Sequence, residues 1–169
     1  KGLAQLAAQG RLVNQSIISI VDFSLPSTEK RLFVIDLTQY KILFNTLVAH
    51  GRNSGKEMAF AFSNQQSSYK SSPGFYTTAD TYMGRNGYSL RLEGLEPGIN
   101  DKALERGIVI HGADYVNQSL ANEQGYIGRS QGCPAVPAKE ATPIINRIKN
   151  GTLLFIYHPA YIKRSALLN

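Results

Sequence analysis

The feature that most constrains the fold is a series of short runs rich in β-branched and aromatic residues, separated by turn-forming residues. Five runs have this composition: SIISIVDF (16–23), RLFVIDL (31–37), KILFNTLVA (41–49), GIVIHG (107–112) and LLFIY (153–157). Such runs are typical of β-strands that are buried on at least one face. The sequence therefore predicts a mainly β protein.

Turn-forming residues indicate how strands pair. The second and third runs are close enough to form a hairpin through residues 38–40. Residues 71–95 read as a second set of short strands, because Pro73-Gly74 and Asn86-Gly87 are turn signals.

Two helices are predicted. GLAQLAAQ, residues 2–9, has a helix-favouring composition, and Gly10 follows as a stop. Thr142 and Pro143 suit the N-cap and first position of a second helix that runs to about Lys149.

The long polar stretch 51–72 is rich in Ser, Asn, Gln and Gly. We expect an irregular surface loop there, with one short strand around residues 58–62. The chain has no internal repeat and no low-complexity tract, so we predict one domain over residues 1–169, with 1–12 as an N-terminal helical extension.

Composition limits the classes of partner. The chain is 43% hydrophobic and 18% charged, as in an ordinary globular protein, and no apolar run approaches the roughly 18 residues of a membrane span. The net charge of +6 suits an anionic partner. Basic residues are scattered, however, and only Lys30-Arg31 and Lys163-Arg164 are adjacent pairs, so we do not expect nucleic-acid binding.

Cys133 is the only cysteine. A single cysteine forms no internal disulfide and is too few for a cysteine zinc site, which leaves a small buried filler or a nucleophile. It lies in GRSQGCPAVP, residues 128–137, between Gly132 and Pro134. This pattern suggests a tight turn in which the N–H groups of Gly132 and Cys133 point at one spot, as an oxyanion hole requires.

A reactive thiol needs a base, and the chain has three histidines, His50, His111 and His158. His111 ends the run GIVIH, and the following Gly112 lets another segment approach and leaves its carbonyl free to orient the imidazole. His50 also ends a run and precedes a glycine, so the residues alone favour His111 only slightly.

Together, His111-Gly112 at a strand end and SQGC at residues 130–133 resemble the active-site signature of the murein L,D-transpeptidase catalytic domain family. In that YkuD-like family, His-Gly precedes Ser/Thr-His-Gly-Cys. Further stretches are similar to the family: STEKRLFVIDL (27–37), VAHGRNSG (48–55), SSPGFYTT (71–78) and YSLRLEGLE (88–96). The resemblance begins at about Val13 and implies an L,D-transpeptidase-like β-sandwich with a few short helices. A longer spacing before the cysteine implies an insertion in the loop 114–128.

The resemblance also implies roles for individual residues. Cys133 matches the nucleophile and His111 matches the general base. Gly112 matches the position whose carbonyl serves as the third member. Ser130, Gln131 and Gly132 match the positions that frame the nucleophile and form its oxyanion and substrate-binding pocket.

Two positions depart from the family pattern. Gln131 replaces the usual histidine, and Ala135 replaces an Arg or Asn that contacts substrate in the family. We therefore expect other side chains to orient the substrate, with Arg129, Arg91 and Tyr76 as candidates. The two arginines suit carboxylates, because a guanidinium binds a carboxylate at two points.

The implied reaction is acyl transfer on peptidoglycan stem peptides, without metal or organic cofactor. Cys133 would attack the carbonyl of the third stem residue, expel D-alanine and form a thioester. An amine of a second stem then gives a 3→3 cross-link, water gives an L,D-carboxypeptidase product, and a protein lysine anchors a protein to the wall. This substrate implies a periplasmic or otherwise extracytoplasmic location. The resemblance also implies that the protein is a target of carbapenems.

Other readings stay open from the sequence. The changes at Gln131 and Ala135 suit a non-catalytic wall-binding module that keeps the fold but not the reaction. A sortase is a more remote alternative, since its signature places an arginine shortly after the cysteine, and here none follows until Arg147. The sequence does not fix the oligomeric state, and a monomer is our expectation.

Overall fold

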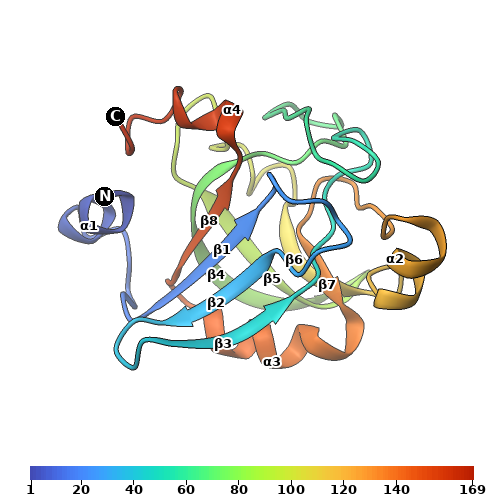
Figure 1. The fold of residues 1–169 in the computed structure, drawn as a ribbon. Helices are drawn as coiled ribbons and strands as arrows, with labels where there is room; N and C mark the ends of the chain where they lie inside the picture. The colour runs from blue at the N-terminus through green and yellow to red at the C-terminus, as the bar shows by residue number, and fades with distance from the viewer.

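A single sheet of eight strands forms the frame of the computed structural model, which describes residues 1–169 (Figure 1). The strands are β1 (Ile17–Asp22), β2 (Leu32–Asp36), β3 (Lys41–Thr46), β4 (Gly74–Gly84), β5 (Gly87–Gly94), β6 (Val109–Ala113), β7 (Ala135–Pro137) and β8 (Leu153–Tyr157). Their order in the sheet is β3-β2-β1-β8-β4-β5-β6-β7. The pairs β1–β8 and β6–β7 are parallel and all others are antiparallel.

The sheet curls until its two edges almost meet. Just beyond β3, the backbone N–H of Ala49 donates to the carbonyl of Ala135 in β7 at 2.8 Å. The half that contains β1, β2 and β3 therefore faces the half that contains β5, β6 and β7 (Figure 1). The mainly β class with a few short helices, expected from the sequence, is confirmed.

The core fills the space between the two halves. Burial alternates along β1 and β2, because successive side chains of a strand point to opposite faces. Val21, Leu92 and Leu154, from three strands, are fully buried members of one cluster of 20 residues.

The helix α3 (Ala138–Ile148) lies along one end of the curled sheet (Figure 1). Its apolar side chains, including Ile144 and Ile145, are buried in the main core. The predicted start at Thr142 is wrong, since the helix begins at Ala138, directly after β7, and Pro143 lies inside it. Burial of the apolar face outweighs the one backbone hydrogen bond that proline cannot make.

Three further helices are short: α1 (Gly2–Ala8), α2 (Gln118–Gln124) and α4 (Pro159–Ile162). The predicted N-terminal helix is confirmed, and Gly10 follows with φ of +67°. α2 occupies the segment that was expected to be a loop, and Asn117 caps it by accepting from the N–H of Leu120. None of the helices has the length and apolar character that a membrane crossing would require.

The hairpin turns follow the predictions. β2 and β3 pair through residues 38–40, with Tyr40 in the left-handed region at φ of +51°. β4 and β5 are longer than expected, 11 and 8 residues, and turn at Asn86-Gly87, where Gly87 has φ of +79°.

The short strand expected at residues 58–62 is absent, so that prediction is wrong. The N–H groups of Phe60 and Ala61 both donate to the carbonyl of Ser54, within the same loop. The Phe60 side chain is 71% exposed. The apolar residues of this stretch therefore lie on a coiled loop rather than in a ladder.

Truncation of α3 tests its role in the core. We expect Ile145→Ala to lower the free energy of unfolding by about 2–5 kcal/mol, because a fully buried side chain leaves a cavity. Urea denaturation measures this loss. Leu104→Ala is the control, since Leu104 is 52% exposed and its truncation should cost about 0.5 kcal/mol or less. Equal losses would contradict the packing described.

Candidate active site

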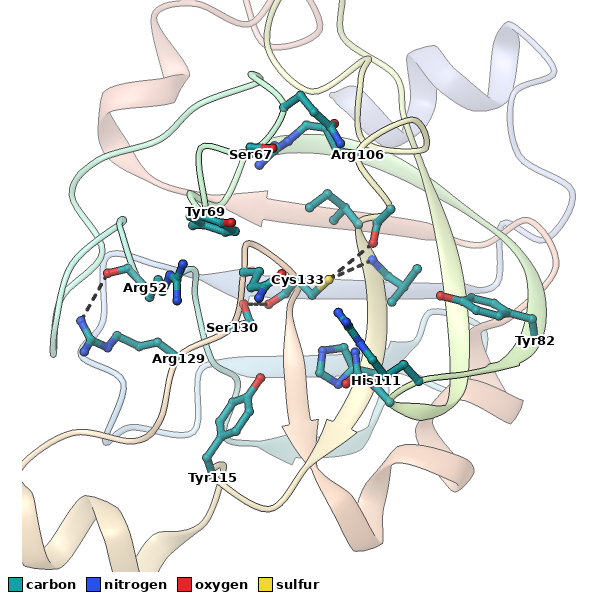
Figure 2. Close-up of a pocket in the computed structure, with 17 residues that line it drawn as sticks. Arg52, Ser67, Tyr69, Tyr82, Arg106, His111, Tyr115, Arg129, Ser130 and Cys133 are labelled. Atoms are coloured by element: carbon teal, nitrogen blue, oxygen red, sulfur yellow. Dashed lines mark hydrogen bonds between the residues drawn. The ribbon is translucent and has the colours of Figure 1, made fainter.

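The parallel pairing of β6 and β7 brings Cys133 close to His111. His111 is opposite Ala135, and Val109 and Cys133 each lie two residues earlier, so all four positions share one register. The N–H of Val109 donates to the Sγ of Cys133 at 3.5 Å, and the thiol lies 3.6 Å from the carbonyl of Gly107 (Figure 2). The thiol therefore faces the start of β6, beside the histidine.

The imidazole of His111 is oriented by the next residue. Its Nδ1 lies 2.9 Å from the carbonyl oxygen of Gly112. A carbonyl oxygen only accepts, so in the neutral imidazole Nδ1 carries the proton and Nε2 keeps its lone pair. A Cβ on Gly112 would lie 2.9 Å from the Cβ of Ala141 and 3.0 Å from the Cα of Ala138. As the sequence suggested, this glycine lets a second segment, α3, approach the backbone.

The turn before Cys133 is held by Ser130. Its Oγ donates to the carbonyl of Cys133 at 2.6 Å and accepts from the N–H of Gly132 at 3.1 Å. Gly132 has φ of +123°, which L side chains rarely adopt. The prediction that the N–H groups of Gly132 and Cys133 together form an oxyanion hole is therefore wrong for Gly132, because its N–H is bound to Ser130. Of the two, only the N–H of Cys133 is left for a ligand.

Cys133 and His111 line a cavity of about 550 Å³. The cavity wall is cationic and aromatic and contains no Asp or Glu. Its charged and aromatic residues are Arg52, Arg85, Arg106, Arg129, Tyr69, Tyr82 and Tyr115. Such a wall favours an anionic ligand.

Arg106 joins the polar loop 51–72 to this cavity. One guanidinium nitrogen donates to the carbonyl of Ser63 and the Oγ of Ser72, at 2.9 and 2.7 Å. The other donates to the Oγ of Ser68 and the carbonyl of Lys70, at 3.1 and 2.8 Å. Arg106 has no acidic partner, so its charge acts on the cavity uncompensated.

The Cys133 thiol is protonated at rest. Burial raises its pKa above the ordinary value, and the Val109 N–H and the positive charge of Arg106 lower it only in part. A nucleophilic role would therefore need a base at the moment of reaction.

Three predicted contact residues lie at the cavity: Arg129, Ser130 and Gln131. Arg91 does not line it. Its guanidinium pairs with Asp80 at 2.6 Å, and its Cζ lies 4.1 Å from the centre of the Tyr82 ring. Arg91 therefore packs against a residue of the cavity wall without lining the cavity itself.

Tyr76, the remaining predicted contact, is misplaced. Its side chain is fully buried in the main core and its hydroxyl donates to the carbonyl of Ser72 at 2.8 Å. Burial raises the pKa of this phenol. The prediction that Tyr76 contacts substrate is wrong, because β4 turns this side chain inward.

The other histidines have structural positions. His50 is fully buried, and its Nδ1 accepts from Arg31 at 2.8 Å while its Nε2 faces the carbonyl of Gly55 at 3.1 Å. Burial and the charge of Arg31 lower the pKa of His50 to about 4. His158 caps α4 by accepting from the N–H of Ala160. Only His111 therefore offers a base to the cavity.

Three arginines of the cavity wall, Arg52, Arg85 and Arg106, were not predicted from the sequence. They come from separate loops, and each adjoins a glycine at a turn or strand end: Gly51, Gly84 and Gly107. That adjacency is the only local signal they share.

The fold and the site define a β protein with a histidine on β6 and a cysteine in the turn that leads into the neighbouring parallel strand β7. The chain belongs to the L,D-transpeptidase catalytic domain family, whose sequence model matches residues 1–157. Comparison with curated protein sequences finds no match.

Solved structures share the fold at low sequence identity. An L,D-transpeptidase from Mycobacterium smegmatis superposes with a TM-score of 0.52 at 12% identity, over 85% of this chain and 59% of that one. L,D-transpeptidase 3 from Mycobacterium tuberculosis gives 0.52 and 12%, over 85% and 61%. The helical cell shape determining protein Pgp2 from Campylobacter jejuni gives 0.54 and 14%, over 85% and 48%. The chain thus spans about three-fifths or less of these relatives.

His50 predicts a pH dependence of stability. Its folded pKa of about 4 lies below the ordinary value of about 6.5, so the unfolded chain binds the extra proton between these values. Stability should therefore fall as the pH drops from about 6.5 to 4, by about 3 kcal/mol from this group. Guanidinium unfolding of the wild type and His50→Asn across this range measures it. Equal slopes in both proteins would rule out the assigned buried state.

Alkylation tests the state of the thiol. Because its pKa is raised, we expect iodoacetamide to modify Cys133 with a pH midpoint above that of a free cysteine peptide. Arg106→Gln should move the midpoint higher still. Mass spectrometry reads the rate directly, since Cys133 is the only cysteine. A midpoint near neutrality would contradict the protonated resting thiol.

Proposed function

We propose that this chain is a cysteine-dependent acyltransferase, an L,D-transpeptidase that acts on peptidoglycan stem peptides. The observation that carries the proposal is the Cys133 thiol beside a histidine whose free Nε2 is fixed by the Nδ1–Gly112 contact. Family membership supports the substrate class. The location is then extracytoplasmic, where peptidoglycan lies.

The acylation step follows from the protonated thiol. Nε2 of His111 takes the proton from Sγ as sulfur bonds to the carbonyl carbon of the third stem residue. As sulfur attacks, negative charge develops on the carbonyl oxygen, and the free N–H of Cys133 and the nearby guanidinium groups stabilise it. The C–N bond to D-alanine then breaks, and His111 returns the proton to the leaving amine.

The second step decides the product. A neutral amine of another stem attacks the thioester, passes a proton to His111 and displaces the thiolate, which regains that proton. The result is a 3→3 cross-link. Water in place of the amine gives a shortened tripeptide stem, the L,D-carboxypeptidase outcome. Neither step needs a metal or organic cofactor.

The substituted position Ala135 does not weaken the catalytic reading. Ala135 is fully buried and its carbonyl accepts from Ala49, so the position belongs to the sheet closure. Carboxylate contacts can come instead from arginines in the surrounding loops. The retained Cys133 and His111 favour an enzyme over a non-catalytic wall-binding module.

Product analysis on purified disaccharide-tetrapeptide tests the proposal. We expect cross-linked dimers with the wild type, none with Cys133→Ala, and a loss of roughly 100-fold or more with His111→Ala, since general base catalysis contributes about that much. His158→Ala is the matched control, because His158 does not line the cavity. Liquid chromatography with mass spectrometry identifies the products.

The outcomes separate the alternatives. Tripeptide without dimers would replace the transpeptidase assignment with a carboxypeptidase. No product, together with no imipenem adduct on Cys133, would favour a wall-binding module. Imipenem suits this test because a structurally similar L,D-transpeptidase has been solved in complex with it.

A further inference from the structure

Arg52 has an exposed guanidinium at the cavity wall that makes no hydrogen bond within the protein. Figure 2 shows it beside Tyr69, on one side of Cys133, while Tyr82 lies on the other side. By contrast, Arg106 uses both terminal nitrogens on the loop 51–72. Arg52 therefore has donors to spare for a ligand.

The backbone of Arg52 is fixed relative to the candidate nucleophile. Its N–H donates to the carbonyl of Ser130 at 2.8 Å, and Gly51 and Ser130 form a parallel bridge. Ser130 in turn holds Cys133 through its Oγ. Arg129 donates to the carbonyl of Arg52 at 3.3 Å. The backbone of Arg52 is thus connected through Ser130 to the turn that contains Cys133.

The guanidinium is also positioned by an aromatic face. Its Cζ lies 4.0 Å from the centre of the Tyr69 ring, a cation–π contact. Tyr69 is in the left-handed region at φ of +53°, which is rare for a bulky residue and is typical of functional loops. Its carbonyl accepts from the N–H of Asn53 at 3.1 Å and would lie 2.5 Å from a Cβ on Gly51. These contacts fix the backbone of Tyr69 next to Gly51 and Asn53, the two residues that flank Arg52.

The charge around Arg52 selects an anion. Arg85, Arg106 and Arg129 share the cavity wall, and no carboxylate lines it. A stacked guanidinium keeps its edge N–H groups free, and these match the two oxygens of a carboxylate. A neutral amide has only one oxygen acceptor and carries no charge, so it makes a weaker partner.

We propose that Arg52 determines specificity by binding a carboxylate of the donor stem, on its second or third residue. The protein then prefers stems with a free carboxylate at that residue over stems amidated there. This inference rests on the proposed function for its ligand class. Arg52 contacts the substrate away from the scissile bond, so its effect is on binding rather than on the chemistry at sulfur.

Binding to Cys133→Ala, in which no turnover occurs, tests the inference separately from catalysis. Calorimetry would use three synthetic tetrapeptide stems. In the first stem, the carboxylates of the second and third residues are both free; in the other two, either that of the second residue or that of the third is amidated. We expect one of the amidated stems to bind roughly tenfold more weakly than the free stem, as for the loss of a charged hydrogen-bonded contact.

Substitutions in the same background identify the residue. Arg52→Gln should weaken binding of the free stem roughly tenfold and remove its preference over the amidated stem. Arg52→Lys should keep part of the preference, because the charge remains but the planar fork is lost. Arg11→Gln is the matched control: Arg11 is exposed, lies outside the cavity, and its loss changes net charge equally.

Several results would overturn the inference. These are equal binding of all three stems, absence of binding to any of them, an Arg52→Gln loss that is the same for free and amidated stems, and an equal loss with Arg11→Gln. Failure of the proposed function has a different signature, namely no product from the Cys133-containing wild type. If the protein binds the stems selectively but does not turn them over, the inference about Arg52 stands and the proposed enzymatic activity is refuted.

Discussion

The parallel pairing of β6 with β7 is the interaction on which the rest of the site depends. It sets His111 opposite Ala135 and thereby places Cys133 beside the start of β6. The same two strands are fixed from both sides. Ala49 closes the sheet against Ala135, and α3 packs on Gly112 so closely that only glycine fits. A shift of this register by one residue would turn the cysteine or the histidine to the opposite face.

Electrostatics in the cavity follows from burial and from unbalanced charge. Burial keeps the thiol neutral, while Arg106 opposes that effect without cancelling it. The arginines of the wall have no acidic neighbours at the cavity, so their positive charge remains available to attract an anionic ligand. Arg91 shows the contrast, because Asp80 neutralises it and it only supports Tyr82. A neutral thiol beside a cationic wall fits the proposed base-assisted attack on an anionic substrate.

Local pattern predicted much of the fold because strands and tight turns depend on nearby residues. The runs at 31–37 and 153–157 became β2 and β8, and Asn86-Gly87 formed the expected turn. Two predictions were wrong where tertiary contacts prevailed. The helix α3 starts at Ala138 because its apolar face is buried in the core. Residues 58–62 do not form a strand, because the N–H groups of Phe60 and Ala61 donate to the carbonyl of Ser54.

By itself, the sequence determined the mainly β class, the candidate thiol at Cys133 and a histidine followed by glycine as its partner. Its local pattern favoured His111 over His50 only slightly, and the choice of His111 rested on the family resemblance. The tertiary structure gives that choice a physical basis, because His50 is sealed against Arg31 while His111 lines the cavity. It also decided the cationic wall. Arg52, Arg85 and Arg106 lie in three distant loops, and their charges add only because the curled sheet brings those loops around one cavity.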